Sequence, residues 1–251
     1  MNAGEENLDT DAAWEQWGRR DPYFGVITNP KFRKQELTDE GKHEFFESGR
    51  LHVDYLFYVI NKHLDPKFAP RRILDFGCGV GRTLPAFARI AVDVVGLDVS
   101  PSMLEEADRN CRDRGARNVR LFSSDDALST ADGAFEMIHS CIVFQHIPFP
   151  RGRLIFQRLL TRLAPRGIGA FQFLYSKAAY AEKLGISPPP GSMAGRTPRK
   201  LPLSADPDMQ MNPYNMTEIL FMMQAAGARR FYSDFTDHGG ELGLFVFFQL
   251  G

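Results

Sequence analysis

Two acidic residues and three alternating glycines in the first half of the chain have the types and spacing of a ligand site. Asp75 ends an apolar run, and Gly77, Gly79 and Gly81 follow it at every second position. Asp98 ends the next apolar run, 21 residues beyond Gly77. Glycine lets the backbone approach a ligand where a Cβ would stand in the way. A carboxylate at the end of the second strand of such a unit can bind both hydroxyls of a ribose.

The same pattern argues against a bound pyrophosphate. Nicotinamide and flavin sites have the fingerprint GxGxxG, but Arg82 stands where the third glycine would be. The acidic Asp75 can pair with an ammonium group, directly or through water, and a phosphate site would not favour it. We therefore expect a ligand with a ribose, an amino group and no phosphate, and S-adenosylmethionine has this chemistry. The alternative is a tight strand-to-helix turn whose glycines only permit packing.

Alternating strand and helix patterns surround these residues. Apolar runs predict strands at 71–76, 92–99, 118–124, 135–144 and 167–175, with helices at 81–90, 101–115 and 149–163. Ser100 and Pro101 have the types of an N-cap and a first-turn proline. This order predicts an α/β fold with a mostly parallel sheet and helices on both faces.

The flanking segments follow other patterns. A helix is expected over 41–64, although Gly49 weakens its middle, and residues 176–213 break the rhythm as an irregular insertion. Asn215 and Glu218 have the spacing of a capping box for a helix at 216–226. Two closing strands are predicted at 228–235 and 243–250.

Composition limits the partners and the compartment. The 251 residues include 30 basic and 31 acidic side chains, for a net charge of −1, so nucleic acid is not expected as the main partner. Cys78, Cys111 and Cys141 form no CxxC pair and no metal-ligand spacing, so we expect no metal site and a reducing cytoplasm. The acidic N-terminus lacks a signal-peptide pattern, and the longest apolar run, at 242–248, is too short for a bilayer.

These motifs resemble those of the class I, Rossmann-like S-adenosylmethionine-dependent methyltransferases. ILDFGCGVGR is similar to the first motif of that family, VVGLDVSPSML to the second, and LFSSDDALSTADGAFEMIHSCIVFQHI to the third. The resemblance covers about 71–175 closely and 214–250 more loosely, and it departs from the family where Arg166 replaces the first glycine of a turn. It implies a three-layer sandwich around a seven-stranded sheet whose last strand is antiparallel. Residues 1–65 would be a helical arm or lid, and 66–251 the methyltransferase domain.

The resemblance also implies a set of cofactor contacts. Asp126, followed by Ala127, would meet the adenine amino group, with Asp125 as the alternative one residue earlier. Arg50 could bind the carboxylate of the cofactor, or it could be a solvated arginine. The expected cofactor-binding residues are Asp75, Gly77, Cys78, Gly79, Gly81, Asp98, Val99, Met103, Asp125, Asp126, Ala127, Ser140 and Arg50.

The expected reaction is methyl transfer to an oxygen or nitrogen of a small-molecule acceptor (a metabolite, sugar or natural product). Candidate bases are His139, His146 and His238, and each has a structural alternative: a buried strand residue, a loop-stabilising residue and a solvated loop residue, respectively. The aromatic side chains of the arm, from Trp14 to Phe24, could cover an acceptor or only anchor the arm. The alternatives are a protein or nucleic-acid methyltransferase and a non-catalytic cofactor-binding protein. The sequence does not indicate an oligomeric state.

Overall fold

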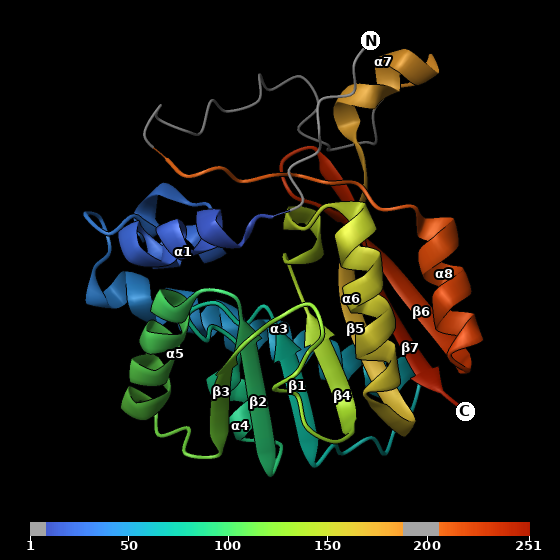
Figure 1. The fold of residues 1–251 in the computed structure, drawn as a ribbon, viewed down its shortest axis with the longest axis horizontal. Coiled ribbons are helices and arrows are strands. Elements are labelled where there is room, and N and C mark those ends of the chain that lie inside the picture. The colour runs from blue at the N-terminus through green and yellow to red at the C-terminus, as the bar shows by residue number, and fades with distance from the viewer. Residues whose placement is uncertain (1–8, 188–205) are drawn as a thin grey trace.

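The computed structural model describes residues 9–187 and 206–251, which form a sheet between two layers of helices (Figure 1). The strand order is β3-β2-β1-β4-β5-β7-β6, and β7 runs antiparallel to both of its neighbours, as predicted. The strands are β1 (Arg72–Phe76), β2 (Asp93–Asp98), β3 (Val119–Ser123), β4 (Phe135–Ser140), β5 (Leu163–Lys177), β6 (Ala228–Asp237) and β7 (Glu241–Leu250). The helices are α1 (Asp11–Arg20), α2 (Pro22–Val26), η1 (Pro30–Phe32), α3 (Asp39–His63), α4 (Leu84–Ala88), α5 (Pro101–Asp113), η2 (Phe144–His146), α6 (Phe149–Thr161), η3 (Ala178–Tyr180), α7 (Ala181–Leu184) and α8 (Met216–Ala225).

Each face of the sheet buries its own apolar core, because neighbouring strand residues point to opposite faces. Ile73 packs with α3 and α4 on one face, whereas Leu74 packs with α6 and α8 on the other. Figure 1 shows α6 and α8 in front of the sheet and α3 and α4 behind it. Because β1 runs parallel to β2 and β4, the carboxyl ends of these strands lie at one edge of the sheet, where ligands bind in folds of this kind.

The N-terminal arm, defined here as α1 and α2, has a core of its own. Trp17, Tyr23 and Phe24 are buried in a cluster with the start of α3 and with Met103 of α5. The Tyr23 hydroxyl lies 2.6 Å from a Glu106 carboxylate oxygen. These three aromatic side chains therefore anchor the arm and do not cover an acceptor.

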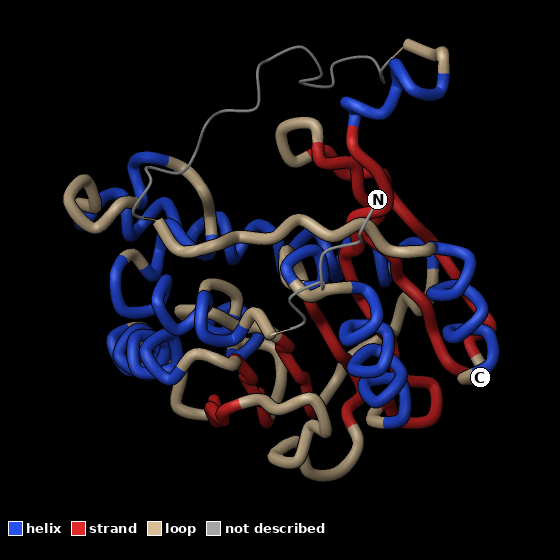
Figure 2. The backbone as a smooth tube through the Cα atoms, turned by 45° about the horizontal axis from the view of Figure 1, so that its top comes forward, coloured by secondary structure: helices blue, strands red, loops and turns tan. Residues whose placement is uncertain are grey.

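A second connection leads from the arm to α8. The extended segment 206–215 contains no helix or strand and passes from the arm to α8, as Figure 2 shows. Trp17 Nε1 donates to the Asp208 carbonyl at 3.2 Å, and the Arg33 guanidinium bridges Asp21 and Asp206. The predicted 176–213 insertion is not irregular at its start, where the end of β5 is followed by η3 and α7. Its centre, residues 188–205, lies outside the described residues.

Three local predictions change in the structure. The fourth strand ends at Ser140 and not at 144, and Ile142 has a φ of 60° in the loop that follows. The helix expected at 81–90 is only α4, because the glycine loop takes up its first residues. Gly49 lies inside an unbroken α3, where a Cβ would be 2.0 Å from the Arg82 carbonyl oxygen. Gly49 thus permits the close approach of α3 to this loop.

Among the described residues, no helix is long and apolar enough to cross a membrane.

Candidate active site

A cavity lies at the carboxyl ends of β1, β2 and β4, beneath the N-terminal arm. The arm and the residue before it contribute Thr10, Asp11, Trp14, Gly25 and Val26. The strand ends and the following segments contribute Phe76, Gly77, Gly79, Asp98, Val99, Met103, Ser124, Asp125, Asp126, Cys141, Ile142, Val143, His146, Ile147, Arg151 and Ile155. The lining thus combines an apolar wall with a few carboxylates, which is typical of small-molecule sites.

The glycine loop brings the backbone up to this cavity. Gly77 and Gly79 have φ values of 74° and 52°, a region that residues with a Cβ rarely adopt. A Cβ on Gly77 would lie 2.3 Å from Val143, and one on Gly79 would lie 2.6 Å from Val26. The amide of Gly77 donates to the Leu97 carbonyl at 2.8 Å, which ties the loop to the end of β2.

Asp98 occupies the position expected of a ribose acceptor. It lines the cavity, and its two carboxylate oxygens accept the backbone amides of Gly79 at 2.8 Å and Ser100 at 2.9 Å. Each carboxylate oxygen can accept a further hydrogen bond. Burial raises the pKa of Asp98 to about 6, although the two amides act in the opposite direction. The carboxylate is thus held rigidly at the cavity wall.

Ser100 links Asp98 to the arm. Its hydroxyl accepts the Met103 amide at 3.1 Å as the N-cap of α5, and it donates to the Glu15 carboxylate of α1 at 2.7 Å. Glu15 also accepts the amide and the hydroxyl of Ser102. The arm is therefore hydrogen-bonded to the first turn of the helix that follows Asp98.

Asp75 lies behind the loop and is not part of the cavity lining. One of its oxygens is 2.7 Å from His139 Nδ1, and the other accepts the Thr83 hydroxyl at 2.6 Å. His139 Nε2 is in turn 2.9 Å from Nε2 of His52 on α3. Burial and the neighbouring His139 lower the pKa of His52 to about 2, so its ring is neutral. Both oxygens of Asp75 thus have partners within the protein, and these bonds do not favour the expected pairing of Asp75 with a ligand ammonium.

The acidic loop after β3 faces the cavity through Asp125 and Asp126. Arg151 of α6 donates to Asp126 at 2.7–3.0 Å and to Asp11 of the arm at 2.8 Å. The Asp11 carboxylate raises the pKa of this guanidinium further, and Asp126 adds to the effect. Asp125 accepts the Ser129 amide at 2.9 Å, which shapes the loop. Sequence reasoning missed Arg151, since nothing in its local pattern indicates that it lines a cavity.

Of the three candidate bases, His146 lies in the described cavity wall. Its Nδ1 is 2.8 Å from the Gln210 carbonyl oxygen, and its ring centroid is 4.8 Å from that of Trp14. Burial lowers the pKa of His146 to about 4, so the ring is neutral and weakly basic. His139 is buried behind the loop, and His238 is exposed between β6 and β7. Neither ring lines the described cavity, and a catalytic role for His139 or His238 stays a prediction.

Several other expected contacts also fall outside the described lining. Arg50 does not reach the cavity, because Glu47 and Asp54 on the same helix hold its guanidinium. Cys78 and Ser140 are buried, and Gly81 packs against Ala107 of α5. Further residues outside the lining are Asp75 and Ala127, whereas Val99 and Met103 are part of it.

Comparison with known proteins identifies the class of this fold. A family model of a methyltransferase domain matches residues 73–167. The ubiquinone biosynthesis O-methyltransferase of Methylococcus capsulatus is 29% identical over 119 residues, which cover 47% of this chain and 49% of that protein. The trans-aconitate 2-methyltransferase of Methylobacterium radiotolerans is 38% identical over 111 residues, or 43% of this chain and 39% of that protein. The chain thus spans half or less of the length of these curated relatives.

A solved structure extends the likeness over the whole chain. The magnesium protoporphyrin IX methyltransferase from Synechocystis PCC 6803, solved with bound S-adenosylmethionine, superposes with a TM-score of 0.62. The superposition covers 100% of both chains at 14% sequence identity, so it shows a shared fold. Residues 73–167 match a methyltransferase domain, and the chain has the Rossmann-like fold of the class I S-adenosylmethionine-dependent methyltransferases.

Proposed function

We propose that this protein transfers the methyl group of S-adenosylmethionine to an oxygen or nitrogen atom of a small-molecule acceptor, such as a metabolite, sugar or natural product. The observation that carries the proposal is the Asp98 carboxylate, which two backbone amides hold at the wall of a cavity beside two left-handed glycines. Its free lone pairs suit the two hydroxyls of a ribose.

The residues present fit the cofactor. The absence of a Cβ at Gly77 and Gly79 leaves room for close approach of the nucleoside, and Val99 and Met103 supply apolar contacts. Asp125 and Asp126 also line the cavity, and a carboxylate oxygen of this loop would accept the exocyclic amino group. When bound, the cofactor supplies an activated methyl group on a sulfonium sulfur.

The chain itself then contributes positioning. Trp14 and Val26 of the arm, together with Val143 and Ile147, form an apolar wall that excludes water from the reacting atoms. Alignment of the nucleophile with the methyl group can lower the barrier by roughly 7–11 kcal/mol. Because the pKa of His146 is lowered to about 4, this neutral side chain suits orienting an acceptor better than removing a proton from it.

The small-molecule class of acceptor is supported by the cover over the cavity. The arm belongs to the same chain and reaches the rim through the bond between Asp11 and Arg151. A partly covered pocket of this kind suits a small acceptor better than a broad protein or nucleic-acid surface. The relatives named above methylate small molecules according to their names.

Binding and turnover test the proposal separately. Calorimetry with S-adenosylmethionine, S-adenosylhomocysteine and NAD is expected to show micromolar binding of the two sulfur nucleosides and none of NAD. Release of S-adenosylhomocysteine is then followed with panels of small phenols, carboxylic acids and amines, and with bulk RNA and protein. Turnover only with the macromolecules would contradict the proposed acceptor class. Cofactor binding without turnover on any panel or on a cell extract would favour a non-catalytic role.

A further inference from the structure

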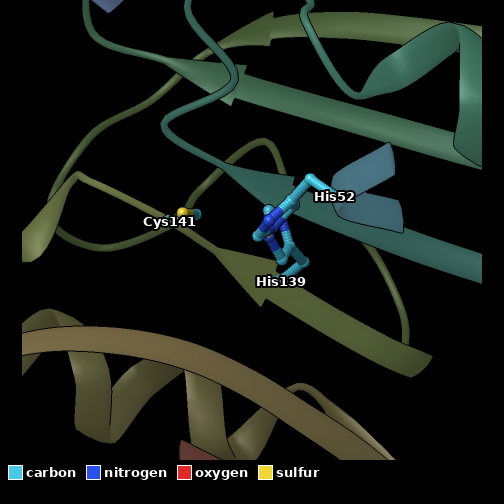
Figure 3. Close-up of side chains that lie close together, drawn as sticks. All are labelled: His52, His139 and Cys141. Atoms are coloured by element: carbon cyan, nitrogen blue, oxygen red, sulfur yellow. Dashed lines mark hydrogen bonds between the residues drawn. The ribbon is translucent and has the colours of Figure 1, made fainter. Parts of the chain in front are cut away.

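Three side chains that can each donate one ligand atom to a metal ion converge behind the glycine loop. His52 comes from α3, His139 is the penultimate residue of β4, and Cys141 follows the end of that strand. Their donor atoms all lie within 4.8 Å of one another. Figure 3 shows the two imidazole rings facing each other, with Cys141 on the loop beyond the strand.

The His139 ring is already oriented as a metal ligand would be. Its Nδ1 is 2.7 Å from an oxygen of Asp75, so Nε2 points away from the carboxylate and toward His52 Nε2, 2.9 Å away. Histidine ligands usually donate their second ring nitrogen to a carboxylate in this way, which fixes the tautomer and the ring orientation. The Thr83 hydroxyl holds the other oxygen of Asp75 in place.

The donor set selects a class of ion. Two imidazoles and one thiolate suit a borderline-soft cation such as Zn²⁺, whereas Mg²⁺ and Ca²⁺ require oxygen ligands. Tetrahedral Zn–N bonds of about 2.0–2.1 Å place two nitrogens roughly 3.3 Å apart. The two rings at 2.9 Å therefore need to separate by only a few tenths of an ångström, while Cys141 needs to move closer.

We propose that His52, His139 and Cys141 bind one Zn²⁺-type cation, with Asp75 orienting His139 and a water completing the coordination. His52 is partly exposed and Cys141 lines the cavity, so an ion can reach the site. Such an ion would join α3 to the loop of Cys141 and Val143, which forms one wall of the cavity. This inference does not depend on the proposed acceptor or on turnover.

The test uses the full chain without a metal-binding tag. After removal of metals with a chelator, the protein is equilibrated with Zn²⁺ and analysed by elemental mass spectrometry, and the Zn²⁺ affinity is measured against a chromophoric chelator. We expect one Zn²⁺ per chain. The dissociation constant should rise at least tenfold in each of Cys141→Ser and His52→Gln. Protein loaded with Co²⁺ should show a thiolate-to-cobalt charge-transfer absorption that Cys141→Ser removes.

Matched controls separate this site from adventitious binding. His63→Gln removes an exposed histidine from the same helix, and Cys111→Ala removes another thiol, so both should leave the stoichiometry and affinity unchanged. Circular dichroism checks that each variant is folded. If His52→Gln does not fold, the cobalt spectrum of Cys141→Ser tests the site without it. Well under one Zn²⁺ per chain, no charge-transfer absorption, or equal affinity in the wild type and Cys141→Ser would overturn the proposal.

Discussion

Replacing Asp98 by asparagine is the sharpest test of the ribose site. The two oxygens of Asp98 accept one amide each, from Gly79 and Ser100. Asparagine has one oxygen and one NH₂ group, so one backbone N–H must face a donor. Of the two ribose hydroxyls, only one keeps an acceptor, and that acceptor is no longer charged. A hydrogen bond to a charged group contributes about 1.5–3 kcal/mol. We therefore expect Asp98→Asn to weaken S-adenosylhomocysteine binding roughly 10- to 150-fold.

The stability of the unbound protein should change much less. An unmet buried donor costs about 1–3 kcal/mol, but removing the partly buried charge relieves the desolvation that raises the pKa of Asp98. Asp93→Asn is the matched control, because Asp93 begins the same strand and binds Arg72 and Arg120 outside the cavity. Calorimetry gives the affinity and thermal melting gives the stability. Wild-type affinity in Asp98→Asn, or an equal loss of affinity in Asp93→Asn, would refute the reasoning.

Three further outcomes follow from other contacts. Gly49→Ala should lower the free energy of unfolding, measured by urea titration, by about 1–3 kcal/mol or more, since its Cβ would lie 2.0 Å from the Arg82 carbonyl oxygen. The control Gly41→Ala, on the same helix, should cause no such loss. Arg151→Gln should speed amide hydrogen exchange in α1 roughly tenfold or more, because it removes charged hydrogen bonds of about 1.5–3 kcal/mol between the arm and α6. Unchanged exchange would mean that other contacts hold the arm in place. Because the pKa of Asp98 is raised to about 6 and only its carboxylate accepts both hydroxyls, the dissociation constant for S-adenosylhomocysteine should rise about tenfold from pH 7 to pH 5. Calorimetry at both pH values should find that Asp98→Asn lacks this pH dependence.

The sequence predicted the parts of the fold that depend on local pattern. The seven-stranded, mostly parallel sheet and its antiparallel last strand were expected from the family resemblance and are confirmed, whereas the strand order was not predicted. The N-cap at Ser100 follows from residue types at fixed offsets and is present, whereas the left-handed conformation of Gly77 and Gly79 was not predicted. The predicted fourth strand is too long, because the apolar residues 141–144 resemble a strand continuation, although 141–143 line the cavity and Phe144 begins η2.

The unpredicted parts depend on contacts between distant segments. Arg151 looks like an ordinary charge in the first turn of a helix, and only the fold brings it to Asp11 and Asp126. His52 and His139 are 87 residues apart, so their contact leaves no trace in local spacing. Cysteine spacing alone likewise gave no indication that Cys141 lies close to these two histidines.

The hydrogen bonds of Ser100 connect the arm, which lies over the cavity, to Asp98 in the cavity wall. Its amide holds Asp98, while its hydroxyl holds Glu15 of the arm. If a nucleoside enters or leaves beneath the arm, the arm must move and the bond between the Ser100 hydroxyl and Glu15 must break. The Ser100 side chain is then free, next to the amide that binds Asp98. If Asp98 binds a ribose as proposed, movement of the arm and release of the nucleoside are linked through Ser100. Under the proposed function, we therefore expect release of the spent cofactor, which requires both bonds of Ser100 to loosen, to limit repeated turnover.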